Sequence, residues 1–334
     1  MIRFILLAAG NGERLWPMST DERPKQFLPL FPHPKNSSSP VSMLQRLVAQ
    51  LSDLGYHDQI SIVTTQAHSD LVHAQVGPIP LHLIPYRKES FASVAWGALD
   101  AAKKFNMKDD DRLIFLPVDH FVSETFFQRI KDLSYNLISK PLAIGLLGIK
   151  PTEPLTSYGY IQIGTNHGLG ISRAHLFIEK PNEMIARTLL KNSLWNAGIF
   201  ALQINACYRI FPFFHALYPS ASAHAMNVWF DALSAESFDR EILENYPEMY
   251  VAKFEGEWED VGTWDRATKH MCTTTMGPSY LFASQNVHVI NDLLQPVIVA
   301  GLHDVAVIAT ARGIVITKKT LAPQLKAFRR EVIL

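Results

Sequence analysis

An apolar segment near the start of the chain runs directly into a glycine loop that is followed by positive charges. Residues 4–9 form the apolar segment, Gly10 and Gly12 lie in the loop, and Arg14 and Lys25 follow it. Glycines let backbone N–H groups approach phosphate oxygens closely, and an arginine adds a rigid fork of donors that suits phosphate. Gly-x-Gly alone is also an ordinary tight turn. The loop has neither the lysine ending of a P-loop nor the third glycine of a dinucleotide fingerprint.

Two aspartates have the position and chemistry of magnesium ligands. Asp119 directly follows the apolar run 113–118, and Asp260 lies in the tryptophan-rich stretch 258–264. Mg²⁺ binds carboxylate oxygens, and ligands gather at the carboxyl ends of parallel strands. Asp119 could equally cap the next helix, and Asp260 could form a turn. Taken alone, the residues leave both interpretations open.

Three polar residues further along the chain interrupt or end apolar segments. Glu179 and Lys180 end the run 176–178, where a lysine could hold a phosphate and a glutamate could accept hydrogen bonds from sugar hydroxyls. Composition alone favours an exposed strand end at this place. Asn196 lies inside the apolar segment 195–200, and a buried amide needs hydrogen-bond partners. The histidines show no zinc spacing, and no Ser-His-Asp grouping stands out.

Composition narrows the class of protein. The 334 residues carry 31 acidic and 31 basic side chains, so the net charge indicates no nucleic-acid or membrane partner. No segment reaches the roughly 18 apolar residues that cross a bilayer, and the apolar run at the start lacks the features of a secretory signal. The two cysteines, Cys207 and Cys272, have no metal-ligand spacing, which suits a reducing compartment. We therefore predict a cytoplasmic protein.

The elements that must position these residues alternate between strands and helices. Periodic apolar segments between the strands predict helices, one of them capped by Ser42 and stopped by Gly55. This alternation predicts an α/β fold with a mostly parallel, Rossmann-like sheet and helices on both faces. The predicted strands of the sheet are 4–9, 60–64, 81–84, 113–116, 142–149, 160–163, 176–179 and 198–202.

The last part of the chain has a different pattern. After about residue 280, short apolar runs follow one another with no helical segment between them, which predicts a small β-rich element. We expect a catalytic domain over residues 1–275 and a β-rich domain over 280–334. Exposed strand edges in such a tail make it a candidate contact between copies in a homo-oligomer. The proline-rich stretch 31–40 is predicted to be a surface loop of unassigned role.

The order of the motifs is more specific than any one of them. The chain contains, in sequence, LLAAGNGERLWP, RPKQFLPL, LPVDH, SYGYI, FIEKP, WNAGIF and WEDVGTWD. From residue 2 to about 320 this series closely resembles the mannose-1-phosphate guanylyltransferase family, the GDP-mannose pyrophosphorylases. The resemblance implies a nucleotidyltransferase fold with a β-rich end. It also implies that GTP and mannose 1-phosphate give GDP-mannose, a precursor in polysaccharide biosynthesis, and pyrophosphate with the help of Mg²⁺.

The resemblance assigns roles residue by residue. The implied nucleotide site consists of Ala8, Ala9, Gly10, Gly12, Arg14 and Lys25. The implied sugar-phosphate site consists of Gly159, Glu179, Lys180 and Asn196. The implied catalytic residues are Arg14, Lys25, Asp119 and Asp260, with the two aspartates as Mg²⁺ ligands. The sugar phosphate would attack the α-phosphate of GTP in line. Because that phosphate is already ionised, the reaction needs positioning and charge neutralisation more than a general base.

Some positions depart from the family pattern. Ala9 replaces a glycine, Glu13 replaces a threonine, and 310–313 reads Thr-Ala-Arg-Gly in place of Thr-Pro-Asp-Ala. Residues 88–93 replace the stretch that helps to recognise the base. A sister enzyme that uses another nucleotide or sugar is therefore the first alternative, and a catalytically silent regulatory paralogue is the second. The phosphomannose isomerase domain of many bacterial members is expected to be absent.

Overall fold

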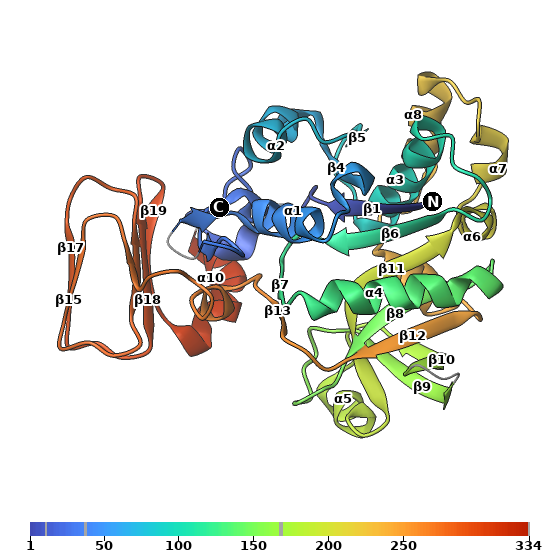
Figure 1. The fold of residues 1–334 in the computed structure, drawn as a ribbon. Helices are drawn as coiled ribbons and strands as arrows, with labels where there is room; N and C mark the ends of the chain where they lie inside the picture. Colours follow the sequence, from blue (N-terminus) through green and yellow to red (C-terminus); the bar gives the residue numbers. More distant parts are fainter. Residues whose placement is uncertain (11, 37–38, 167–169, 333–334) are drawn as a thin grey trace.

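The computed structural model describes residues 1–10, 12–36, 39–166 and 170–332. Within these residues a nine-stranded sheet forms the centre of the molecule, with helices on both faces and a smaller β-rich unit at one end (Figure 1). The strand order from edge to edge is β5 (Leu81–Ile84), β4 (Ile60–Thr65), β1 (Ile2–Leu7), β6 (Arg112–Pro117), β11 (Ser193–Gln203), β8 (Ile144–Ile149), β12 (Met249–Phe254), β10 (Ile171–Ile178) and β9 (Tyr160–Asn166).

Most described strands of the sheet run in one direction, as predicted, but antiparallel pairings of β10 and β11 make the sheet mixed. β1 pairs parallel with β4 and β6, and β12 pairs parallel with β8. Among the described strands of this sheet, β10 and β11 run opposite to the others, since β11 pairs antiparallel with both β6 and β8. Leu7 is in register with Pro117. The loops that leave the carboxyl ends of β1 and β6 therefore start side by side.

Both faces of the sheet are buried under helices, which explains the unbroken apolar run at the start of the chain. Phe4 and Leu6 pack on one side and Ile5 on the other. The first face is covered by α1 (Met43–Asp53), α2 (Ser69–Val76) and α4 (Thr125–Asn136). The second face is covered by α3 (Ser90–Lys104), α6 (Ile204–Ile210) and α8 (Ala223–Ala232). In the described part of the chain, no helix combines the length and apolar character that spanning a membrane requires.

The start and end of α1 follow the signals in its sequence. The Ser42 hydroxyl accepts a hydrogen bond from Gln45 N at 3.1 Å, while Ser42 N donates to the Gln45 side chain at 3.0 Å, which completes a capping box. Gly55 follows the helix with a left-handed φ of 82°, a conformation that glycine adopts without steric cost. The remaining short helices are α5 (Glu183–Leu189), α7 (Phe214–Leu217) and α9 (Trp264–Ala267).

The β-rich unit consists of short strands that pair in parallel, except for an antiparallel last pair, with valines between them. One sheet contains β14 (Thr275–Met276), β16 (His288–Asn291), β18 (Val305–Thr310) and β19 (Gly313–Lys318), and the other contains β15 (Ser279–Phe282) and β17 (Val297–Ala300). Its core includes Val287, Val289, Val299, Val305 and Val307. A contact between copies through this unit remains a prediction.

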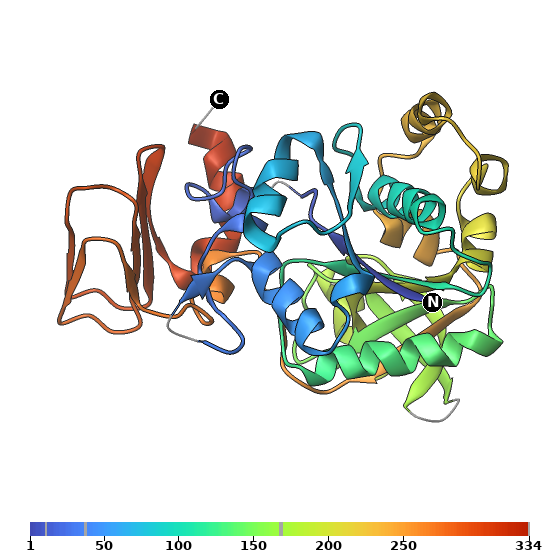
Figure 2. The same cartoon turned by 45° about the horizontal axis from the view of Figure 1, so that its top comes forward.

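The chain then forms a helix that the sequence analysis did not predict. A 3₁₀ segment, Lys319–Gln324, leads into α10 (Leu325–Val332). This helix returns to the catalytic part of the molecule and packs against η1 (Glu13–Leu15), the 3₁₀ turn after β1 (Figure 2). The proline-rich stretch of residues 31–40 forms the small hairpin of β2 (Phe31–Pro32) and β3 (Pro40–Val41), with residues 37–38 outside the described chain.

Candidate active site

Two adjoining cavities open at the carboxyl ends of β1 and β6. Both are lined by Ala9, Gly10, Lys25 and Asp119. Their volumes are about 280 Å³ and about 650 Å³, and the second lies within the size range of small-molecule sites. The first cavity extends to Ser90, Ser93, Gly198, Phe200 and Asp239. The second extends to Gly12, Glu13, Arg14, Gly262 and Lys326.

The glycine loop after β1 is held by side chains from the segment that follows it. Gln26 Nε2 donates to the carbonyl oxygens of Ala8 at 2.8 Å and Gly10 at 3.0 Å, and the Ser19 hydroxyl donates to Gly12 O at 2.7 Å. Gly12 has a φ of 65°, and a Cβ at this position would lie 2.3 Å from the Lys25 side chain. Glycine at position 12 therefore lets Lys25 cross the loop. Asn11 lies outside the described residues.

Lys25 meets Asp119 at the border of the two cavities. Lys25 belongs to η2 (Lys25–Phe27), and its Nζ donates to Asp119 Oδ2. Burial opposes ionisation of Asp119, but the charges of Lys25 and His120 outweigh it and hold the pKa of this carboxyl well below its usual range. Asp119 is therefore a carboxylate at neutral pH. The alternative interpretation as a helix cap does not apply, because β7 (His120–Val122) follows it.

Asp260 is brought next to Asp119 by a short strand pair. β13 (Trp258–Asp260) pairs antiparallel with β7, which places Asp260 opposite His120, and Val261 N donates to Asp119 O at 3.0 Å. Gly262 N donates to Asp260 Oδ1 at 2.9 Å, so the turn-forming interpretation of this aspartate also holds. A Cβ at Gly262 would lie 3.4 Å from Lys25 Nζ. Lys25, Asp119 and Asp260 are therefore neighbours in space.

The two aspartates suit a magnesium ion that is shared with a substrate. Within the described residues no group of three or more His, Cys, Asp or Glu side chains is arranged to hold a metal. Mg²⁺, however, is commonly bound by one or two carboxylates, with phosphate oxygens and water completing the octahedron. Asp119 and Asp260 supply that number of carboxylates next to a cavity that also contains Arg14. The donor set fits Mg²⁺ when a phosphorylated substrate is present.

The four residues assigned to the sugar phosphate form a second cluster. Asn196 N donates to Gly159 O at 2.8 Å, and a Cβ at Gly159 would lie 2.7 Å from Glu179 Oε2. Asn196 Oδ1 accepts from Gly198 N at 3.0 Å. Lys180 Nζ lies 2.6 Å from Glu179 Oε1 and its side chain is 55% exposed. Lys180 is therefore paired at the surface of this cluster and is not part of either cavity lining.

Asp239 joins this cluster to the first cavity, and sequence reasoning did not identify it. Asn196 Nδ2 donates to Asp239 Oδ1 at 2.5 Å, and Asp239 also lines the cavity with Lys25 and Asp119. It begins the π-helical turn Asp239–Leu243, a type of turn that is frequent at functional sites. Burial and then the nearby Glu179 charge raise the pKa of Asp239 to about 7. No local sequence signal marks this residue, because its partners are distant in the chain.

The perturbed pKa of Asp239 predicts a pH-dependent contribution to stability. Its pKa is about 7 in the folded chain, against 3.8 for an ordinary aspartate. The stabilisation that comes from this raised pKa is therefore fully present below the ordinary aspartate pKa of 3.8. It is lost as the pH rises through 7. Asp239→Asn should remove this loss, so that the variant gains about 4 kcal/mol relative to the natural chain between about pH 4 and about pH 8, because each unit of pKa shift corresponds to about 1.4 kcal/mol. Urea unfolding across that range measures the difference, and a pH-independent difference would contradict the prediction.

The segment that departs from the family's base-recognising stretch lines both cavities. Lys88 Nζ donates to the carbonyl oxygens of Phe230, Asp231 and Leu233 at 2.8–2.9 Å. It therefore caps the carboxyl end of α8, where a positive charge is favourable. Glu89 also contributes to both cavity walls. The segment contributes to the cavity walls, and its lysine is engaged by the protein.

Comparison with known proteins identifies the family. Residues 3–276 match the nucleotidyl transferase family. The chain belongs to this family. It is 28% identical over 284 residues to the xanthan biosynthesis protein XanB of Xanthomonas campestris pv. campestris. This match covers 78% of this chain and 57% of XanB. It is 29% identical over 292 residues to the mannose-1-phosphate guanylyltransferase of Salmonella montevideo. This match covers 79% of this chain and 59% of that protein. The chain thus matches less than two thirds of the length of these relatives.

A solved structure is similar to this chain over its whole length. The structure described as a mannose-1-phosphate geranyltransferase from Thermus thermophilus superposes with a TM-score of 0.83 at 23% identity, and covers 100% of this chain and 99% of that one. Identity at this level shows the fold, including the β-rich end. The family resemblance of the motifs and the predicted fold class are confirmed.

Proposed function

We propose that this nucleotidyl transferase is a cytoplasmic enzyme that makes GDP-mannose and pyrophosphate from GTP and mannose 1-phosphate. The observation that carries the proposal is the meeting of Lys25, Asp119 and Asp260 beside the glycine loop, at the carboxyl ends of β1 and β6. An open α/β sheet binds its ligands at this place. The names of the relatives support the choice of mannose 1-phosphate and of a guanine nucleotide.

The residues of the first site would position and neutralise two polyanions. Arg14 and Lys25 would bind phosphate oxygens of GTP, and Asp119 and Asp260 would hold Mg²⁺, which supplies positive charge at the α-phosphate. An oxygen of mannose 1-phosphate would attack the α-phosphorus while the bond to the pyrophosphate oxygen breaks. No proton has to be removed from this nucleophile. The reaction therefore needs cations and metal-binding carboxylates, which this site has, and no general base.

The second cluster would select the sugar. Glu179 has a 6% exposed side chain, and the Asn196 amide is fixed between Asp239 and Gly198. Rigid hydrogen-bond acceptors and donors of this kind discriminate between sugars. A sugar with a wrongly placed hydroxyl leaves these buried protein groups without a partner, which weakens its binding. Asp239, which lines the cavity, would present its carboxyl to the sugar as well.

Pyrophosphate release from the purified full chain tests the proposal. The protein is incubated with Mg²⁺, mannose 1-phosphate and, in turn, GTP, ATP, UTP or dTTP. Selective turnover with GTP supports the guanylyltransferase. Preference for another nucleotide would assign the chain to a sister enzyme, which the altered segment after Arg87 makes the second candidate. Silence with all nucleotides and with glucose 1-phosphate would favour the regulatory paralogue.

Lys180→Ala tests the assignment of the sugar phosphate. The Michaelis constant for mannose 1-phosphate should rise about tenfold, because one charge-assisted contact is lost, while that for GTP should stay within about twofold. Arg187→Ala is the matched control, since Arg187 is 64% exposed and paired with Glu183 at 2.5 Å. A selective loss of GTP affinity would show that Lys180 serves the other phosphate.

A further inference from the structure

The C-terminal helix places a lysine in the cavity that contains the glycine loop. Lys326 Nζ lies 3.0 Å from Glu13 Oε2, and both residues line this cavity together with Gly12, Arg14 and Lys25. Lys326 is separated from the other residues of this cavity by a long stretch of chain. It reaches the site because α10 packs against η1.

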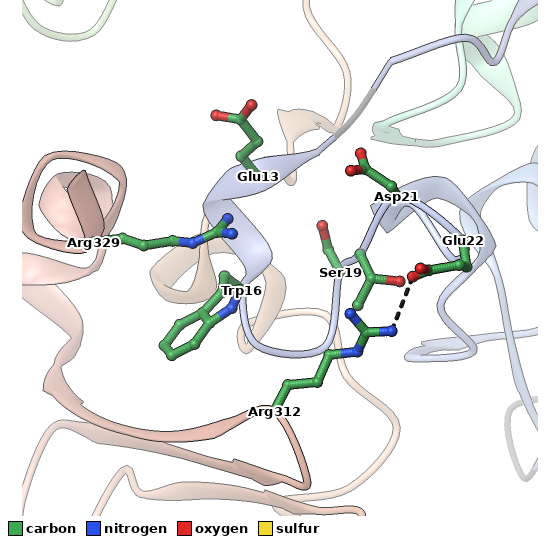
Figure 3. Close-up of a pocket in the computed structure, with 8 residues that line it drawn as sticks. Glu13, Trp16, Ser19, Asp21, Glu22, Arg312 and Arg329 are labelled. Atoms are coloured by element: carbon green, nitrogen blue, oxygen red, sulfur yellow. Dashed lines mark hydrogen bonds and ion pairs between the residues drawn. The ribbon is translucent and has the colours of Figure 1, made fainter. Parts of the chain in front are cut away.

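The helix is anchored to the same loop by a second set of contacts around Trp16. The Arg329 guanidinium lies over the Trp16 ring at 5.5 Å, a cation–π arrangement. Trp264 Nε1 donates to Trp16 O at 3.0 Å, and a Cβ at Gly313 would lie 2.7 Å from the Trp16 ring. Figure 3 shows Arg329 extending from α10 toward Trp16. These contacts hold α10, and with it Lys326, in a defined position.

The other two lysines of this cavity are held by a largely buried pair or by several acceptors, and Arg87 has an exposed partner. Lys25 pairs with Asp119, Lys88 caps α8 through three carbonyls, and Arg87 lies 3.1 Å from Asp21. The partner of Lys326 is Glu13, and the side chains of this pair are 44% and 42% exposed. A half-exposed pair of this kind adds little to stability. A polyphosphate in the cavity would compete effectively with Glu13 for the ammonium group, because it carries several charges.

We propose that Lys326 is a further phosphate-binding residue of this site, which contacts the β- and γ-phosphates of the nucleotide, the part that leaves as pyrophosphate. This inference rests on the proposed function, since it assigns a ligand to the same cavity. Glu13 keeps the ammonium group at the cavity when no nucleotide is bound. The C-terminal unit thereby contributes a phosphate-contacting side chain to the nucleotide site, in addition to packing against it.

Calorimetric binding of GTP, GMP and pyrophosphate to the full chain tests this assignment. Lys326→Ala should weaken the binding of GTP and pyrophosphate about five- to tenfold and leave the binding of GMP unchanged, because GMP lacks the two outer phosphates. Lys253→Ala is the matched control: Lys253 is 43% exposed, is paired with Glu255 at 2.5 Å and lies outside both cavity linings. Equal loss for GTP and GMP, or no loss for GTP, would overturn the assignment.

A double variant separates a phosphate contact from a role that acts through Glu13. Glu13→Gln should tighten GTP binding about two- to threefold, since it removes a negative charge from the cavity and releases Lys326. Glu13→Gln combined with Lys326→Ala should remain about two- to fivefold weaker than the natural chain. Full recovery in the double variant would show that Lys326 only neutralises Glu13. If the natural chain binds pyrophosphate but transfers no nucleotide, the proposed function fails while the binding series still decides the role of Lys326.

Discussion

Asp119→Asn should lower the turnover about a hundred- to a thousandfold while the fold persists. The asparagine keeps the shape of the side chain and one acceptor oxygen but removes the charge that Lys25 stabilises in the natural chain. Mg²⁺ would lose one of its two carboxylates, and Lys25 would lose its partner. The rate of pyrophosphate release at saturating substrates measures the effect.

The control for this variant is a carboxylate outside the site. Asp109→Asn removes a charge that accepts a hydrogen bond from Tyr208 at 3.0 Å, and it should leave the turnover unchanged. Thermal melting of both variants separates a chemical effect from a structural one. If Asp119→Asn loses thermal stability and activity in proportion, the aspartate serves the fold and not the reaction.

Lys25→Met should also lower the turnover, by about a hundredfold or more, and should make stability depend on Mg²⁺. Methionine keeps the length and apolar stem of the side chain but removes the cation that pairs with Asp119. Asp119 then lies beside the Asp260 carboxylate without its own counter-charge, whereas Asp260 keeps Arg266 at 3.8 Å. The lost Lys25–Asp119 pair should cost about 2 kcal/mol of unfolding free energy. Mg²⁺ binding to the two carboxylates should recover part of that loss.

Unfolding in urea with and without Mg²⁺ measures this second effect, and pyrophosphate release measures the first. Lys35→Met is the matched control, because Lys35 pairs with Asp53 at 2.5 Å on the surface and is 68% exposed. Its unfolding should not respond to Mg²⁺ differently from that of the natural chain. An identical response in Lys25→Met would contradict the placement of the metal between Asp119 and Asp260.

The departures from the family pattern have partners in the structure. The charge that Glu13 adds to the loop is balanced by Lys326, and Lys88 is used to cap α8. Arg312 pairs with Glu22 at 2.9 Å, across the border between the β-rich unit and the segment after the glycine loop (Figure 3). Glu13, Lys88 and Arg312 therefore belong to contacts that join distant parts of the chain.

Local patterns in the sequence predicted most of the sheet. Strands buried on both faces read as continuous apolar runs that glycines and polar loops interrupt, so the predicted strands at 60–64 and 81–84 match β4 and β5 closely. Longer strands were predicted too short: β11 begins at Ser193, well before residue 198, because Trp195 and Asn196 do not follow a simple apolar pattern. Helix α10 was missed because its charged sequence gains its buried side only by packing against η1 and Trp16.

By itself, the sequence determined the α/β class, the glycine loop after the first strand and the identity of the residues that can do phosphate chemistry. Only the tertiary structure decided which of these residues meet. Lys25, Asp119 and Asp260 become neighbours through the pairing of β1 with β6 and of β7 with β13. Asp239 joins Asn196, and Lys326 joins Glu13, by contacts between distant segments. Residue type and local spacing encode backbone preference and burial, whereas charge pairing and pKa depend on neighbours that the folded chain brings together.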